Sequence, residues 1–91
     1  MEVTTVITYT QLRAKVAQLL GRPDIAPGTL SRWMSELGYP KGVPGRKRMW
    51  NTEDAQFISD HASYLALGYN PAESASYAKR QLQKRRASNA N

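Results

Sequence analysis

Residues 27–38 read Pro-Gly-Thr-Leu-Ser-Arg-Trp-Met-Ser-Glu-Leu-Gly. Pro27 suits the first position of a helix, and Gly38 suits the residue that follows the last turn. Between them, large apolar residues recur at i, i+3, i+4 and i+7, which is the spacing of one helix face. These residues are Leu30, Trp33, Met34 and Leu37. The stretch predicts a short amphipathic helix.

A second amphipathic helix is predicted just before it. Thr8 and Gln11 have the spacing of a capping box, in which each side chain accepts a hydrogen bond from the other residue's backbone. Gly21 is expected to end this helix, and Pro23 prevents it from resuming. Its apolar stripe is Leu12, Val16, Leu19 and Leu20. Two short helices joined by the turn 22–26 form a candidate helix-turn-helix.

The face of the second helix opposite its apolar stripe is expected to be exposed and polar. Its residues are Gly28, Thr29, Ser31, Arg32 and Ser35. Such a face fits the major groove of DNA, where base edges offer acceptors to Arg and mixed partners to Ser and Thr. The simpler alternative is an ordinary solvated face. Glu36 would repel phosphate there unless it is paired or faces away.

Basic residues are concentrated in two places. The net charge is +6, and residues 37–50 carry +4 with no acid, while residues 77–91 carry +5. Residues 51–76 carry −4 and no base. This distribution is expected of a protein that binds a polyanion at defined points. Solvated surface charge is the alternative, and it explains the C-terminal cluster better than the first one.

Residues 39–50 contain two prolines and two glycines, Pro40, Gly42, Pro44 and Gly45, so a helix cannot be sustained there. We expect a β-hairpin with its tip at residues 42–47 and with Tyr39 and Trp50 near its ends. One of these two rings should anchor the hairpin to the core. The projecting tip would act as a basic wing, with Lys41, Arg46, Lys47 and Arg48 as its cations.

Two further helices are predicted downstream. Asn51 followed by Glu53 and Asp54 is a helix start, and Asn70-Pro71-Ala72-Glu73 is another. The expected fold class is therefore mainly α, a winged helix-turn-helix of about four helices with a small β-hairpin wing. Residues 1–86 would form this one domain, and residues 87–91 would be a frayed tail. Val3 to Ile7 suggests an initial strand or arm.

Several functional classes are disfavoured. The chain has no cysteine, so thiolate metal sites and disulfides are excluded. No apolar run has the length of a membrane span, and the N-terminus lacks the layout of a signal peptide, so we expect a cytoplasmic protein. His61 has no second metal ligand near it in sequence, and Glu53 and Asp54 fit helix capping better than acid–base catalysis. We expect neither an enzyme nor a cofactor.

Aromatic residues could also stack on the bases of single-stranded nucleic acid. Trp33 belongs to an apolar stripe, so a core position is the better interpretation for it. Trp50 precedes a helix cap and fits an anchor for the wing. Tyr69 follows Gly68 and is expected to make the hydrophobic contact of a helix C-cap.

The order of these segments resembles the DNA-binding domain of MerR-type regulators and the smaller excisionase-like winged-helix proteins. Residues 29–33 resemble the start of the second helix of that superfamily, residues 45–54 its wing and following cap, and residues 67–71 the turn into its fourth helix. The resemblance implies that Arg32 contacts DNA. MerR regulators usually have Arg-Tyr-Tyr after the Thr-Leu pair, where this chain has Ser31-Arg32-Trp33, which is closer to the excisionase-like branch. The resemblance does not extend to the long dimerisation helix and effector domain of those regulators.

The sequence thus predicts a protein that binds double-stranded DNA, as a transcription regulator or an excisionase-like architectural factor. It would assemble on DNA as a homodimer or head to tail. Alternatives left open are the DNA-recognition protein of a phage terminase or segregation system, and a protein- or RNA-interaction adaptor with a basic tail. Membrane binding is poorly supported, because residues 77–86 offer little apolar area.

Overall fold

The computed structural model describes residues 6–39 and 50–89, which form six secondary-structure elements. They are β1 (Val6–Ile7), α1 (Tyr9–Leu19), α2 (Pro27–Glu36), β2 (Trp50–Asn51), α3 (Thr52–Ala66) and α4 (Pro71–Asn89). The expected mainly helical class and the four helices are confirmed in this part of the chain. The helix α4 continues to Asn89, beyond the Arg86 that we expected to end the domain.

Three of the four helices begin with reciprocal capping boxes. The Thr8 hydroxyl accepts from the Gln11 N–H at 3.2 Å, and the Gln11 side chain accepts from the Thr8 N–H at 2.8 Å. Asn51 and Asp54 do the same for α3 at 2.9 and 3.0 Å. Asn70 and Glu73 do so for α4. The sequence predicted all three starts, because each depends only on local residues.

The helix α2 ends in the way that its C-terminal glycine predicted. Gly38 has a φ of +90°, a conformation that costs other residues a clash between Cβ and the backbone. The next N–H, that of Tyr39, donates to the Met34 carbonyl at 3.0 Å. This bond fits the Schellman motif and satisfies a carbonyl that the helix itself leaves without a donor.

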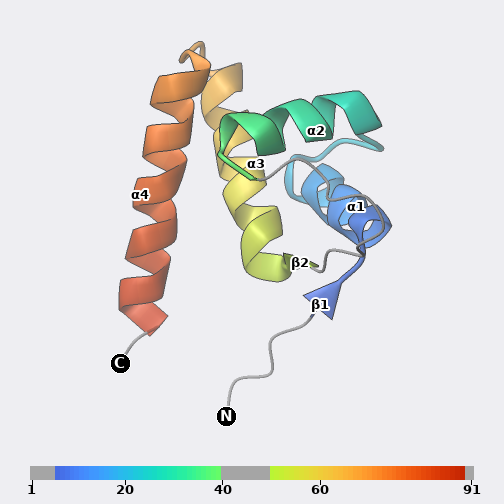
Figure 1. The fold of residues 1–91 in the computed structure, drawn as a ribbon, viewed down its shortest axis with the longest axis horizontal. Coiled ribbons are helices and arrows are strands. Elements are labelled where there is room, and N and C mark those ends of the chain that lie inside the picture. The colour runs from blue at the N-terminus through green and yellow to red at the C-terminus, as the bar shows by residue number, and fades with distance from the viewer. Residues whose placement is uncertain (1–5, 40–49, 90–91) are drawn as a thin grey trace.

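The helix α3 lies in the middle of the molecule, between α4 on one side and α1 with α2 on the other (Figure 1). Ile58 of α3 is fully buried, as are Leu12 and Val16 of α1 and Leu30 of α2. On α4 the buried residues are small, chiefly Ala75 and Ala78, and small side chains let two helix backbones approach closely. One core therefore joins all four helices.

The two short strands pair with each other, so the strand at Trp50 has the N-terminal segment as its partner among the described residues. β1 and β2 are antiparallel, with Ile7 opposite Trp50 and Val6 opposite Asn51. The sequence analysis did not predict this pairing. The rest of the predicted hairpin, residues 40–49, lies outside the described residues.

None of the helices in the described part of the chain combines the length and the apolar character needed to cross a membrane.

Candidate functional site

The helix α2 carries two stripes of opposite character. Its buried stripe is the predicted one, with Leu30, Trp33, Met34 and Leu37 all less than a tenth exposed. The opposite stripe has the same i, i+3, i+4, i+7 spacing and consists of Gly28, Ser31, Arg32 and Ser35, all exposed. Residues with this spacing share one helix face. The structure thus brings four of the predicted site residues together on one open surface.

Two of the predicted polar residues of α2, Thr29 and Ser31, are not fully available to an external partner. Thr29 is half-buried, at the edge between the two stripes of α2. The Ser31 hydroxyl lies 3.3 Å from the Tyr9 hydroxyl, which also donates to the Pro27 carbonyl at 3.5 Å. Tyr9 therefore connects the first turn of α1 to the first turns of α2. The sequence analysis did not identify this contact.

Arg32 is the charged centre of the exposed stripe. Its side chain is exposed, and none of the described residues forms a hydrogen bond or an ion pair with it. Among the described cations, Arg13, Arg85 and Arg86 all have carboxylate partners. The guanidinium of Arg32 keeps its donors available for an external acceptor.

Glu36, the single acid of α2, is turned towards the interior. Its Oε1 lies 2.9 Å from Nε2 of His61, and His61 is fully buried on α3. The other ring nitrogen, Nδ1, has no hydrogen-bond partner among the described residues. His61 is therefore a packing residue of the core and not a residue of the helix surface. The sequence analysis required Glu36 to be paired or to face away from DNA, and its carboxylate is paired rather than directed along the exposed stripe.

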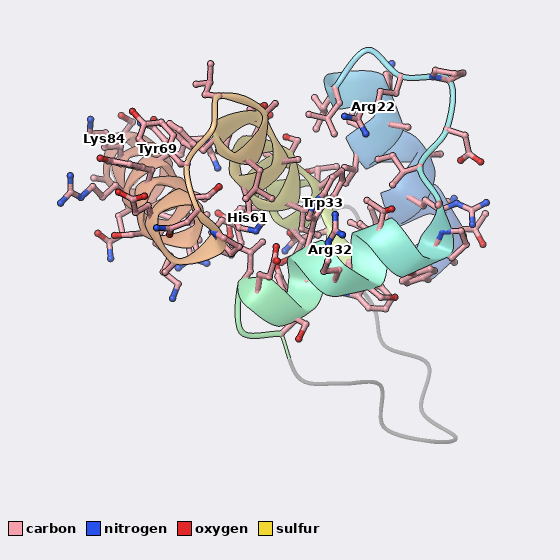
Figure 2. All side chains as sticks on the ribbon, turned by 90° about the horizontal axis from the view of Figure 1, so that it is seen from above. Arg22, Arg32, Trp33, His61, Tyr69 and Lys84 are labelled. Atoms are coloured by element: carbon pink, nitrogen blue, oxygen red, sulfur yellow. The ribbon has the colours of Figure 1, made fainter. Side chains whose placement is uncertain are left out.

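A groove of about 440 Å³ runs beside α2, between this helix and the C-terminal half of α3. Its polar residues are Arg22, Arg32 and Glu36, and its apolar wall includes Trp33 and Leu65. The Arg22 guanidinium carbon lies 5.9 Å from the centre of the Trp33 ring. Figure 2 shows Arg22 near the end of α1, Arg32 and Trp33 on α2, and His61 on α3. Arg22 was not among the predicted site residues, since its position after Gly21 indicated only a turn.

The predicted wing residues Lys41, Arg46, Lys47 and Arg48 lie outside the described residues. Both flanks of that segment are anchored. The Tyr39 hydroxyl donates to Asp54 Oδ1 at 2.7 Å, and its ring lies 6.2 Å from that of Phe57. Trp50 is half-buried and meets Tyr9 edge to face at 5.6 Å. We expected one of the two rings to pack against the core, and both Tyr39 and Trp50 do so.

Part of the basic charge of α4 is neutralised within the molecule. Arg85 pairs with Asp60 at 2.8 Å, and Arg86 pairs with Glu53 at 2.9 Å. The hydrogen bond and the charge of Glu53 raise the pKa of Arg86 above its ordinary value. Two acidic residues of α3, Glu53 and Asp60, thus face two of the cations of α4. Lys79, Arg80 and Lys84 remain exposed on the outer face of α4.

The tyrosines near the α3–α4 turn pack on one another. Tyr64, Tyr69 and Tyr77 have ring centres 5.0 to 5.9 Å apart. The Tyr69 N–H donates to the Tyr64 carbonyl at 3.3 Å, and Gly68 between them has a φ of +102°. The predicted C-cap contact of Tyr69 is confirmed. The core position predicted for Trp33 is confirmed as well, because this residue is only 5 % exposed. These contacts account for the rings without a stacked base.

Comparisons with protein-family models, with curated proteins and with solved structures found no match for this chain.

Proposed function

We propose that this protein binds double-stranded DNA in a sequence-specific way, with α1 and α2 as a helix-turn-helix and α2 as the helix that enters the major groove. The observation that carries the proposal is the arrangement of charge on α2. Its exposed stripe has an arginine with no partner among the described residues, while its one acid is bound to a buried histidine. A helix face of this kind can approach a polyanion without a free carboxylate that would repel the phosphates.

The roles on α2 follow from the size and chemistry of the side chains. Gly28 and Ser35 are small, so the helix can lie close to the floor of the groove. Arg32 is the residue that would read sequence, because its fork can bond the O6 and N7 atoms of one guanine. Thr29 and Ser31 would contact bases or the adjoining phosphates. Ser31 would do so from a position fixed by Tyr9.

The basic segment supplies the second half of the proposed interface. Lys41, Arg46, Lys47 and Arg48 would contact the DNA backbone or an adjacent minor groove, as the wing of a winged helix-turn-helix. Contacts to phosphate fix the position of a protein on DNA, and base contacts specify the sequence. The anchored flanks at Tyr39 and Trp50 support this role, because they fix where the segment leaves and rejoins the fold.

The proposed biological role is that of a small transcription regulator or an excisionase-like architectural factor, in line with the resemblance to MerR-like proteins. Two or more copies would assemble on the site, since one short helix reads few base pairs. Closely spaced direct repeats in the preferred DNA would indicate head-to-tail assembly, and one inverted repeat would indicate a homodimer.

The test is to select binding sites from random duplexes and to measure affinity for the preferred site by fluorescence anisotropy. The Arg32→Ala variant should lose about 1–3 kcal/mol of discrimination at one base pair. The Lys47→Ala variant should weaken all duplexes about equally and reduce the salt slope by about one.

Arg86→Ala is the matched control for Arg32→Ala. It removes an arginine that is already paired with Glu53, at the C-terminal end of α4 and away from α2 (Figure 1). Single strands, structured RNA and anionic vesicles, each at two salt concentrations, complete the test. Equal or tighter binding to any of these than to the preferred duplex would overturn the proposal.

A further inference from the structure

The groove beside α2 holds two guanidinium groups that lack a carboxylate partner. Arg22 and Arg32 both line it, and none of the described residues forms an ion pair with either. The third charged residue of the lining is Glu36, whose carboxylate is engaged by His61 at 2.9 Å. The groove therefore offers cationic donors to an external anion.

Arg22 is held in place by the fold. Gly21 has a φ of +69°, and the Arg22 N–H donates to the Ala17 carbonyl at 2.9 Å, which fixes the backbone at the end of α1. The side chain extends over the ring of Trp33, with the guanidinium carbon 5.9 Å from its centre. A guanidinium in a cation–π contact keeps its N–H groups free for hydrogen bonds. Arg22 is thus oriented before any ligand arrives.

The groove is continuous with the exposed stripe of α2, because Arg32 belongs to both. A double helix that received α2 in its major groove would have one sugar–phosphate strand along each flank of the helix. The flank towards α3 is the one that contains the groove (Figure 2). The anion that this geometry would place over Arg22 is a backbone phosphate.

We propose that Arg22, in cation–π contact with Trp33, binds one backbone phosphate of duplex DNA in the groove between α2 and α3. This inference rests on the proposed function and adds to it a contact residue outside α2 and the basic segment. A guanidinium fork suits the paired oxygens of a phosphodiester, and such charge-assisted bonds are stronger than neutral ones. Arg22 fixes the position of α2, while Arg32 beside it reads a base.

The test measures duplex affinity against salt concentration for the wild type and for Arg22→Ala. Losing one phosphate contact should lower the slope of log K against log salt by about 0.9. If the two curves meet near 1 M salt, the variant should bind about eightfold more weakly at 0.1 M salt, for preferred and random duplexes alike. Arg22→Lys, which keeps the charge, should recover most of the slope.

Arg86→Ala is again the control, since it removes one paired guanidinium of the same chemistry and should leave the slope unchanged. Thermal unfolding of each variant shows whether it is folded. A wild-type slope for folded Arg22→Ala, with wild-type protein binding duplexes tightly, would overturn this inference and leave the proposed function standing. A loss at one base pair alone would also overturn it, because that result marks a base contact. Failure of the wild type to bind any duplex would overturn both proposals.

Discussion

Nε2 of His61 on α3 and Oε1 of Glu36 on α2 lie 2.9 Å apart, which joins the last turn of α2 to the interior. The histidine is fully buried, and the glutamate side chain is 21 % exposed. No other described residue bonds to the ring, since Nδ1 has no partner. This one contact both satisfies a buried polar atom and withdraws a negative charge from the exposed stripe.

Removing the carboxylate should therefore destabilise the fold. In Glu36→Ala the Nε2 atom of His61 is left buried without a partner, and such an atom costs about 1–3 kcal/mol. Glu36→Gln keeps an oxygen that can accept the same bond and should unfold closer to the wild type. Urea denaturation followed by circular dichroism measures both free energies of unfolding. Equal stability of Glu36→Ala and the wild type would show that the contact does not contribute.

The same glutamine variant tests the electrostatic role of Glu36. Because it removes a negative charge beside the exposed stripe without removing the hydrogen bond, Glu36→Gln should bind duplex DNA more tightly at low salt. The gain should shrink as salt screens the charge, since the Debye length falls from about 10 Å at 0.1 M to about 3 Å at 1 M. Anisotropy titrations at several salt concentrations measure it. Weaker binding at low salt would contradict this account of the charge on α2.

The sequence predicted what depends on neighbouring residues. The starts of α1, α3 and α4 and the glycine-terminated ends follow from capping boxes and from residues that accept a positive φ, so local pattern was sufficient. The buried stripe of α2 followed from its periodicity. Leu19, which the pattern placed on the apolar stripe of α1, is 41 % exposed, and Ala17 is buried in its place. The residues that surround Leu19 in space, and not its spacing along α1, decide how exposed it is.

Contacts between distant segments could not be predicted. Nothing near residue 50 in sequence indicates that Trp50 pairs with Ile7, and nothing near residue 36 indicates His61. The candidate site shows the same division. Its exposed stripe was visible as a helical period, whereas Arg22 joined it only because the turn after α1 places its guanidinium over Trp33.

The turn between α3 and α4 should depend on its glycine, Gly68. Gly68 has a φ of +102°, and a Cβ there would meet no atom within 4 Å, so Gly68→Ala is strained only through its own backbone. We expect a loss of about 1–2 kcal/mol. Gly28→Ala is the matched control, because Gly28 is helical and equally open, and alanine favours helices. Thermal unfolding should separate the two, and an equal shift in both would contradict the assignment.

The two ion pairs of α4 should contribute unequally to stability. Arg85 is 33 % exposed and its partner Asp60 19 %, while Arg86 is 62 % exposed and Glu53 38 %. Solvent screens the second pair more strongly, and exposed pairs contribute little. Arg85→Ala should lower the free energy of unfolding measurably, and Arg86→Ala should change it by less than the error of a urea titration. The reverse order would show that burial does not govern these pairs.

Tyr9 should couple the stability of the fold to the position of the exposed stripe. Its hydroxyl lies 3.3 Å from the Ser31 hydroxyl and donates to the Pro27 carbonyl, so Tyr9→Phe removes the polar link between α1 and α2 but keeps the ring against Trp50. A double-mutant cycle with Ser31→Ala should show an interaction free energy of at least about 0.5 kcal/mol in urea denaturation, as expected for residues in contact. In DNA binding, Tyr9→Phe should weaken the preferred site more than random duplexes, because a less firmly held α2 loses base contacts before phosphate contacts. Additive single-mutant effects, together with unchanged discrimination between sequences, would show that Tyr9 does not position α2.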